Sequence, residues 1–536
     1  MPKTRKKPSK GITTVSFVSL GCPKNLVDSE KMLGLLAENG IQPVSYSGDP
    51  SFDDADAVVI NTCGFLEASK EESLSVIHEA IAAKSRGDVK RVVVAGCLVQ
   101  RHRAKMLDWA PGIDAMIGVF DRDHVVEAVR GPEPSTRAKG LEDGESPKYW
   151  IAGNALAAAK DRGMKVAGLT VNGKDGKGIG YFEDDGARLR LTPRHYAYLR
   201  ISEGCNQNCT FCTIPSIRGK MRSKPLDRIV LEAKELVRDG AFELNLIGQD
   251  TTSYGDDIGY SKGMPGMLRA VSDAVKEEGG SGWVRLMYAY PSNFSDEMID
   301  AFAELCAKGS VVPYIDMPLQ HASDEVLKAM RRNVTRAKQE RVIKRLRAKV
   351  PGMAVRTTFI SGFPGETEDQ HKELLDFVGA MEFDALGVFE YSHEPGTPAG
   401  TMEDDPKLAI PAKVKARRKA EVMELQQKIA FKRSEAAGGG FEPSDHASGK
   451  RINVLIDEPT QSSGVATTGV GKGGKLYKGR TTAQAPMIDS VTFVQSREKL
   501  APGELVQCVL VGSDGYDLVA RPLAEIEKKV GLRVLK

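Results

Sequence analysis

The sequence of 536 residues has no apolar run near the ~20 residues that a membrane-spanning helix needs. Its basic start is not followed by a hydrophobic segment, so it does not form a secretory signal. The net charge is only +3, which gives no overall electrostatic field that would attract nucleic acid. These absences favour a cytoplasmic protein with no membrane partner. We interpret residues 1–12 as a disordered basic tail, with a grip on ribosomal RNA as the alternative.

The composition and cysteine usage fit a globular enzyme in a reducing compartment. Hydrophobic residues make up 41% and charged residues 27% of the chain, and its length predicts several domains. There are eight cysteines, but a long chain without an export signal rarely carries a disulfide framework. We therefore expect most of them to bind metal. Cys306 and Cys508 lie in apolar segments and are expected to be core thiols.

Residues 13–130 alternate strand and helix patterns, as in a parallel sheet covered by helices. The predicted strands are Thr13–Leu20, Ala57–Asn61 and Arg91–Ala95. These strands run into Cys22, Cys63 and Cys97 respectively. Parallel strands end at one edge of a sheet, and helix amino termini near that edge favour thiolates. We therefore expect the three cysteines to hold a metal cluster, with three buried structural thiols as the alternative.

A second set of βα units follows a linker. Residues 131–188 are rich in Gly, Asp, Lys and Glu, and we interpret them as a linker, part of which forms a hairpin. Residues 189–405 predict six strands with helices between them, a curved parallel sheet or partial barrel. The predicted strands are His195–Ile201, Glu243–Ile247, Val284–Tyr288, Pro313–Met317, Val355–Ile360 and Ala385–Tyr391.

A loop after the first of these six strands contains three more cysteines. Cys205, Cys209 and Cys212 are separated by three and then two residues. Three thiolates on a 4Fe–4S cluster leave the fourth iron free for a substrate or cofactor. The alternative is a zinc loop that takes its fourth ligand from elsewhere.

The carboxy-terminal part of the sequence no longer alternates strand and helix patterns. Residues 406–440 predict a charged helical connector, and residues 441–522 predict a small β-barrel with short strands and turns. The barrel segment has nine acidic and nine basic residues, so its charge does not indicate RNA as a ligand. Residues 523–536 are expected to be a tail.

These motifs together resemble a known enzyme family. The three-then-two cysteine spacing, with Phe211 before the last cysteine, resembles the signature of the radical S-adenosylmethionine enzymes. The order of the three domains resembles the methylthiotransferases, whose last module is the TRAM domain. The segments that resemble the branch acting on small-subunit ribosomal protein twelve are Val18–Glu30, Thr192–Gly204, Ile214–Gly219 and Pro313–Ser323.

The resemblance implies a fold and a reaction. The fold is α/β, with an amino-terminal parallel-sheet domain, a partial (βα)6 barrel and a small TRAM-like barrel. The activity is addition of a methylthio group to the β-carbon of an aspartate, with two 4Fe–4S clusters and S-adenosyl-L-methionine as cofactors. The Cys205 loop would hold the cluster that cleaves S-adenosylmethionine into a 5′-deoxyadenosyl radical, and the Cys22 triad would hold a second cluster. An external electron donor is required, because the sequence has no flavin or ferredoxin motif.

The other candidate residues for cofactor binding are weaker. They are Phe211, Gln249, Asp250, Gly362 and Glu366. The alternatives are a core aromatic for Phe211, a helix cap for Gln249 and Asp250, and a plain tight turn for Gly362 and Glu366.

Two further polar residues have candidate roles. His321 is expected either near a substrate carboxylate or as a cap of the following helix, and Arg218 as a carboxylate partner. We assign no catalytic acid or base.

Two other functions are compatible with the cysteines. One is methylthiolation of an adenosine in transfer RNA, but that branch typically has Tyr-Gly-Cys-Gln-Met-Asn at the first cysteine, and this sequence has Leu-Gly-Cys22-Pro-Lys-Asn. The other is a non-enzymatic iron–sulfur factor that binds or assembles ribosomes. The complete cofactor-like motif favours an enzyme.

Overall fold

The computed structural model describes residues 11–44, 52, 55–131, 150–151, 185–438, 449–461 and 474–526, to which all structural statements refer. The predicted basic tail, the hairpin within 131–188 and the carboxy-terminal tail lie outside these residues almost entirely. The chain forms two compact units. The first comprises Met1–Leu191, Ser202–Asn208 and Cys212–Lys224, and the second comprises Thr192–Ile201, Cys209–Phe211 and Pro225–Lys536.

The first unit is built on a parallel sheet with the order β2-β1-β3-β4-β5-β6. Its strands are β1 (Thr14–Ser19), β2 (Gln42–Val44), β3 (Ala57–Thr62), β4 (Arg91–Gly96), β5 (Ala115–Ile117) and β6 (Trp150–Ile151). Its main helices are α1 (Pro23–Glu38), α2 (Glu67–Arg86), α3 (Cys97–His102), α4 (Met106–Trp109) and α5 (Val125–Arg130). The three predicted strands are confirmed as β1, β3 and β4. The other three strands have only two or three residues each, too few to give a periodic pattern in the sequence.

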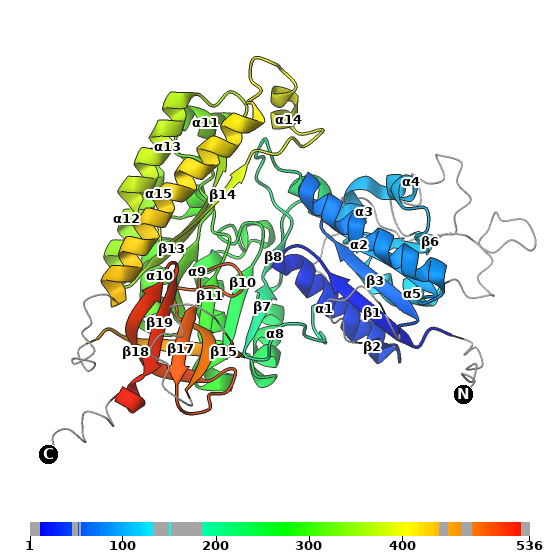
Figure 1. Ribbon diagram of the computed structural model, residues 1–536, viewed down its shortest axis with the longest axis horizontal. Helices are drawn as coiled ribbons and strands as arrows, with labels where there is room; N and C mark the ends of the chain where they lie inside the picture. The colour runs from blue at the N-terminus through cyan, green and yellow to red at the C-terminus, as the bar shows by residue number, and fades with distance from the viewer. Residues whose placement is uncertain are drawn as a thin grey trace, which may run out of the picture. The chain divides into compact units, whose positions relative to one another are not determined.

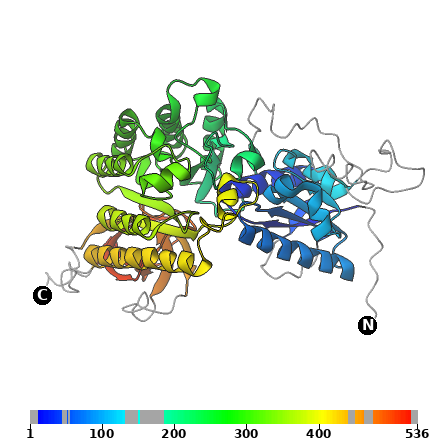
Figure 2. The same cartoon turned by 90° about the horizontal axis from the view of Figure 1, so that it is seen from above.

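Helices cover both faces of this sheet (Figure 2). On one face, Val15, Val59 and Val93 pack with α1 and α5; on the other, Val58 and Val92 pack with α2. Burial on both faces explains why the strands read as continuous apolar runs rather than alternating ones. The loop 202–224 adds the short pair β8 (Ser202–Glu203) and β9 (Arg222–Ser223), with α7 (Ile214–Arg218) between them.

The second unit contains a parallel sheet with the order β14-β13-β12-β11-β10-β7. Its strands are β7 (Tyr196–Arg200), β10 (Glu243–Ile247), β11 (Trp283–Leu286), β12 (Val311–Asp316), β13 (Ala354–Ser361) and β14 (Ala385–Glu390). Its helices include α8 (Leu226–Arg238), α9 (Gly263–Gly279), α10 (Asp296–Ala307), α11 (Asp324–Ala329), α12 (Arg336–Lys349), α13 (Glu368–Met381) and α14 (Pro398–Glu403). All six predicted strands are confirmed, each with bounds within about two residues of the prediction.

The carboxy-terminal module is a closed barrel with the order β15-β16-β17-β19-β18, as predicted. Its strands are β15 (Arg451–Thr460), β16 (Lys475–Arg480), β17 (Thr492–Ser496), β18 (Leu505–Asp514) and β19 (Asp517–Pro522). The sequence runs Arg451–Ile456, Ser490–Val494 and Leu505–Val511 predict only β15, β17 and β18. The other two strands, β16 and β19, carry charged residues that interrupt their apolar alternation.

The small barrel docks on the amino-terminal ends of the strands in the second sheet (Figure 1). Arg480 pairs with Glu243 at the start of β10, and Glu243 also accepts a 2.7 Å bond from Arg285. Arg285 donates in turn to the carbonyl of Thr482 at 2.7 Å. Because these strands are parallel, the barrel sits opposite the edge from which β7 enters the cysteine loop.

The predicted connector is the 27-residue helix α15 (Ala412–Gly438), which packs along α13, β14 and β18 (Figure 1). Its buried side chains include Val422, Ile429 and Ala430. The helix therefore belongs to the core of the second unit rather than spanning free between domains. No helix of the described residues has both the length and the apolar content needed to cross a membrane.

Candidate functional site

Cys22, Cys63 and Cys97 lie at the carboxyl ends of β1, β3 and β4, which are neighbours in the sheet. Cys22 is the amino-terminal cap of the 16-residue α1, and Cys97 is the first residue of α3. The expected position beside helix amino termini is therefore confirmed for these two thiols. A helix amino terminus stabilises a thiolate or an anionic cluster.

Two glycines bring the three cysteine loops together. A Cβ on Gly21 would lie 2.7 Å from the Cβ of Cys63, and the φ angle of Gly21 is +87°. A Cβ on Gly64 would lie 2.8 Å from the Cα of Leu98 and 3.0 Å from the carbonyl carbon of Cys97. Only glycine permits these close approaches. The sequence shows both glycines next to cysteines, but their packing role becomes visible only in the structure.

Burial suppresses the ionisation of Cys63 and Cys97 in the absence of a metal. Burial raises the pKa of Cys63, and it raises the pKa of Cys97 to about 12, while Arg218 acts in the opposite direction on both. Cys22 and Cys63 each further oppose the ionisation of Cys97. Metal ligation would remove the burial penalty, because a ligating thiol is deprotonated by the metal. Three neighbouring thiols are a donor set that fits a 4Fe–4S cluster with one free iron.

Cys205, Cys209 and Cys212 lie in the loop after β7, as predicted. Cys205 Sγ accepts a bond from the Gln207 amide, and Cys212 Sγ accepts one from the Ile214 amide, each at 3.4 Å. Amide N–H groups directed at sulfur stabilise thiolates and influence the potential of an iron–sulfur cluster. The chain itself keeps the three cysteines close, since they fall within eight consecutive residues.

Two residues that the sequence analysis missed surround Cys209. Arg332 Nη1 donates to Cys209 Sγ at 3.7 Å, and the Arg332 guanidinium lies 3.9 Å from the centre of the Tyr290 ring. The Tyr290 hydroxyl lies 4.0 Å from the same sulfur. No motif marks Arg332 or Tyr290 in the sequence, because the loops after α11 and β11 bring them to Cys209 only in the folded chain.

The residue between Cys209 and Phe211 anchors this part of the loop. Thr210 donates through its amide to the carbonyl of Met330 at 3.1 Å and through its hydroxyl to that of Ala329 at 2.9 Å. Phe211 is half-buried and packs with an apolar group that includes Met330 and Phe363. The structure thus gives Phe211 a packing role, and its contact with an adenine ring stays a prediction.

Gln249 and Asp250 follow β10 at the same edge of the sheet. The Asp250 carboxylate is buried and accepts bonds from its own turn: from the Thr252 hydroxyl at 2.7 Å and from the Ser253 hydroxyl at 2.8 Å. These bonds close a turn rather than cap a helix, because the next helical segment begins only at Asp256. Gln249 is half-buried at the end of the strand. Cofactor binding by either residue stays a prediction.

The turn from Ser361 to Glu366 follows β13 and is held by its own glutamate. Glu366 Oε2 accepts bonds from the amides of Gly362 at 2.7 Å and Phe363 at 3.0 Å. Gly362 has a φ angle of +73°, which favours glycine. Burial raises the pKa of Glu366. The carboxylate therefore shapes this turn, and it would act on a cofactor through the backbone that it positions.

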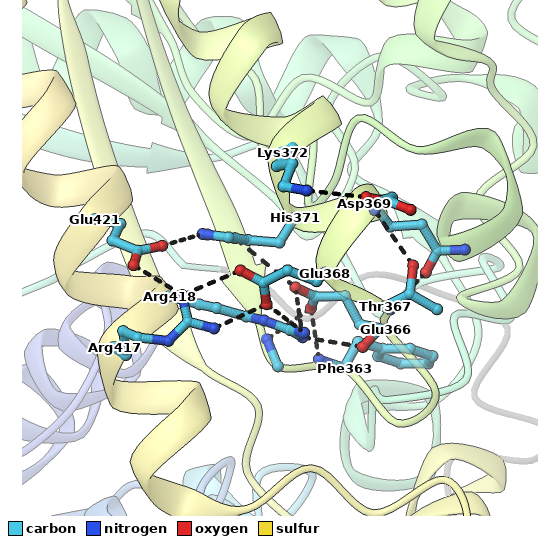
Figure 3. Close-up of polar contacts among 12 residues, drawn as sticks. Phe363, Glu366, Thr367, Glu368, Asp369, His371, Lys372, Arg417, Arg418 and Glu421 are labelled. Carbon is cyan, nitrogen blue, oxygen red and sulfur yellow. Dashed lines mark hydrogen bonds and ion pairs between the residues drawn. The ribbon is translucent and has the colours of Figure 1, made fainter.

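Helix α15 supports this turn (Figure 3). Arg418 donates to the Glu366 carbonyl at 3.0 Å and pairs with its carboxylate at 3.1 Å. On the same side, His371 bonds to Glu421 at 2.6 Å. His321 is fully buried near Glu366 and accepts a 3.0 Å bond from the Ser323 amide, which supports its role as a cap. The sequence pattern predicts α15 only as a connector and does not mark Arg418 as a functional residue.

No three Cys, His, Asp or Glu side chains among the described residues converge as the ligands of a single metal ion do. In an iron–sulfur cube each thiolate binds a different iron, so its ligand sulfurs stand further apart. Cys306 and Cys508 lie outside both sets, and burial raises the pKa of each thiol to about 12, as expected of core thiols.

Comparisons with known proteins agree with this geometry. The Radical SAM superfamily matches residues 199–378, the Uncharacterized protein family UPF0004 matches residues 14–118, and the TRAM domain matches residues 449–523. A solved radical S-adenosylmethionine methyltransferase, TsrM from Kitasatospora setae, shares the fold with a TM-score of 0.50 at 14% identity. This match covers 72% of this chain and 75% of that one.

Curated relatives match over nearly the whole chain. Ribosomal protein uS12 methylthiotransferase RimO of Desulforamulus reducens is 37% identical, covering 94% of this chain and 98% of the relative. The protein of the same name from Acetivibrio thermocellus is 38% identical, covering 96% and 99% respectively. The predicted family, transferase class and α/β fold are thus confirmed, as are S-adenosylmethionine and 4Fe–4S clusters as cofactors. This chain belongs to the uS12 methylthiotransferase family of radical S-adenosylmethionine enzymes.

Proposed function

We propose that this protein adds a methylthio group to the β-carbon of one aspartate in ribosomal protein uS12. The observation that carries the proposal is the presence of two separate three-cysteine sets, each at the carboxyl edge of a parallel sheet, in a chain of which 94% matches a uS12 methylthiotransferase. A reaction that breaks an unactivated C–H bond and also inserts sulfur needs more than side-chain acids and bases.

The residues divide into two groups. Cys205, Cys209 and Cys212 would hold one 4Fe–4S cluster, and the triad at the ends of β1, β3 and β4 would hold the other. When bound, the two clusters and S-adenosylmethionine supply the carbon-centred radical, the sulfur and the methyl group. Because the protein provides three thiols rather than four for each cluster, one iron of each cluster would have no protein ligand.

The remaining candidate residues of the second unit organise the cofactor pocket. Glu366 fixes the turn at Gly362, and Arg418 fixes Glu366 from α15. Arg332 places a positive charge and a hydrogen-bond donor beside the Cys209 sulfur, where an anionic cluster would be bound. We infer that Phe211, Gln249 and Asp250 complete this pocket.

The test uses the anaerobically reconstituted full chain with S-adenosylmethionine and dithionite as the electron donor. Recombinant uS12 should gain the mass of one methylthio group in place of a hydrogen, located at a single aspartate by tandem mass spectrometry. Transfer RNA incubated in parallel should gain nothing. A gain on transfer RNA alone would overturn the choice of substrate.

The same reaction separates an enzyme from a non-enzymatic ribosome factor. Reduced protein should release 5′-deoxyadenosine from S-adenosylmethionine, and a protein that binds ribosomes but releases none should be reassigned as such a factor. We propose that the reaction takes place in the cytoplasm, where uS12 is made, with an external low-potential electron donor in place of dithionite.

A further inference from the structure

Arg218 follows the Cys205–Cys212 loop in the chain, but its buried side chain contacts residues beside the Cys22 triad. It is the last residue of α7, six residues after Cys212 in the chain, and only 2% of it is exposed. Its guanidinium donates to Glu203 at 2.9 Å, to Asn25 at 2.8 Å and to Asp28 at 3.1 Å. All of these residues belong to the first unit.

Asn25, one of its partners, is the hub of the Cys22 triad. The Asn25 side-chain amide donates to the carbonyl of Leu20 at 2.9 Å and to that of Thr62 at 2.8 Å. These two carbonyls lie just before Cys22 and Cys63. Asn25 Oδ1, which accepts from Arg218, also accepts a 3.7 Å bond from the Cys97 thiol, a bond that is lost when this thiol is deprotonated to ligate iron. In either state one amide ties the Cys22 and Cys63 loops to the guanidinium.

Buried ion pairs surround Arg218. Asp28 pairs with both Arg218 and Arg122, Glu203 pairs with Arg218, and Arg122 and Lys224 pair with Asp185. A 4Fe–4S cluster on three thiolates would add net negative charge to this buried region, where Arg218 is the cation bonded to Asn25.

We propose that Arg218 is a positioning residue of the second cluster, which holds the Asn25 hub against the Cys22 triad and raises the reduction potential of the cluster bound there. This inference rests on the proposed function, because it takes the triad to hold a 4Fe–4S cluster. Reduction adds one electron to an already negative group, and a nearby buried cation stabilises the added charge. Removal of the cation makes the cluster harder to reduce.

The experiment isolates the second cluster in the full-length protein. In a parent chain with Cys205, Cys209 and Cys212 changed to alanine, only the Cys22 triad should hold iron. The midpoint potential is measured by dithionite titration followed by electron paramagnetic resonance. Arg218→Gln should lower the midpoint, so that the reduced-to-oxidised ratio at the parent midpoint falls by about tenfold or more. Arg218→Lys, which keeps the charge, should lower it less.

A second substitution tests the sign of the effect. Glu203→Gln removes a negative partner of Arg218 and should raise the midpoint, opposite to Arg218→Gln. General loosening of the site would not move the two midpoints in opposite directions. The exposed Arg86, paired with Asp88 on the surface of the same unit, provides the control Arg86→Gln, which should leave the midpoint unchanged.

The outcomes are distinct. Unchanged midpoints in iron-replete Arg218→Gln and Glu203→Gln, or shifts in the same direction, would overturn the role of Arg218. If the Arg218→Gln variant does not fold or retain iron, the Glu203→Gln variant alone decides. A raised midpoint then supports the role of Arg218, and an unchanged midpoint overturns it. Absence of any cluster signal in the parent chain would instead contradict the proposed function.

Discussion

The hydroxyl of Tyr314, on β12, donates a 2.7 Å hydrogen bond to the carboxylate of Asp489, in the segment between β16 and β17 of the small barrel. Asp489 also pairs with Arg356 of β13 at 3.3 Å, and Arg356 pairs with Asp316 at 2.8 Å. These buried contacts join the small barrel to the sheet that carries the candidate cofactor pocket. The barrel is therefore a structural part of the second unit.

Asp489→Ala should loosen the docked barrel. It leaves Tyr314 and Arg356 without this partner in a buried place, at a cost of about 2–4 kcal/mol. Tyr314→Phe removes one hydrogen bond and should cost about 1 kcal/mol. Hydrogen exchange of peptides covering 475–496 should be faster in Asp489→Ala. The control is Glu458→Ala, on an exposed part of the same barrel; equal exchange in all variants would contradict the docking role.

The docking contacts should also weaken in acid. Burial opposes ionisation of Glu243 and Asp457, but Arg480, Arg285 and His195 outweigh it and hold both pKa values below 4.5 and 3.8. Carboxyl groups with lowered folded-state pKa values stabilise the fold above their unfolded pKa and lose this contribution as pH falls through the folded value. The melting temperature should therefore fall below about pH 4.5. Glu243→Gln should melt lower at neutral pH and show a shallower acid decline, whereas an unchanged decline would contradict this assignment.

His321 should make stability depend on pH in a milder range. Its burial lowers the pKa from 6.5 to about 3, so the folded protein holds the ring neutral while the unfolded chain binds a proton. Protonation of His321 in the unfolded chain costs no stability above pH 6.5. Below this pH the free energy of unfolding falls toward pH 3, by up to about 1.4 kcal/mol per pH unit. His321→Asn keeps an acceptor for the Ser323 amide and should reduce this slope in a urea-denaturation series. His393→Asn, on the surface, is the matched control and should leave the slope unchanged.

The two cysteine sets should have separable tasks. Cys22→Ala should still release 5′-deoxyadenosine from S-adenosylmethionine but transfer no methylthio group to uS12, because only the second cluster is impaired. Cys209→Ala should lose both. Liquid chromatography of the nucleoside and mass spectrometry of uS12 measure the two activities in one reaction. Equal loss of cleavage in both variants would contradict the division of labour.

Iron and sulfide analysis should count the clusters directly. The reconstituted chain should contain about eight iron atoms, and each of Cys63→Ala and Cys212→Ala should retain about four. Cys508→Ala, which changes a core thiol of the small barrel, should retain about eight and serves as the control. A full complement of iron in Cys63→Ala would remove the triad from the site.

Much of this protein could be predicted from local sequence. The apolar runs that end at Cys22, Cys63 and Cys97 predicted strands that share a sheet edge, because a continuous apolar run is a local pattern typical of a buried parallel strand. The spacing of Cys205, Cys209 and Cys212 is likewise local, so no folding information was needed to place those thiols together.

Only the tertiary structure revealed what surrounds those thiols. Arg332 reaches Cys209 across 123 positions of sequence, and Arg218 reaches Asn25 across 193. Arg418 reaches the Glu366 turn from a helix that had looked like a connector. Such contacts depend on which loops the folded sheets bring together, and no periodicity or spacing in a single sequence encodes that pairing. The sequence by itself determined which cysteines form the two sets and which strands precede them. Only the three-dimensional fold decided which buried cations lie beside these cysteines, because burial and charge pairing are properties of the assembled core.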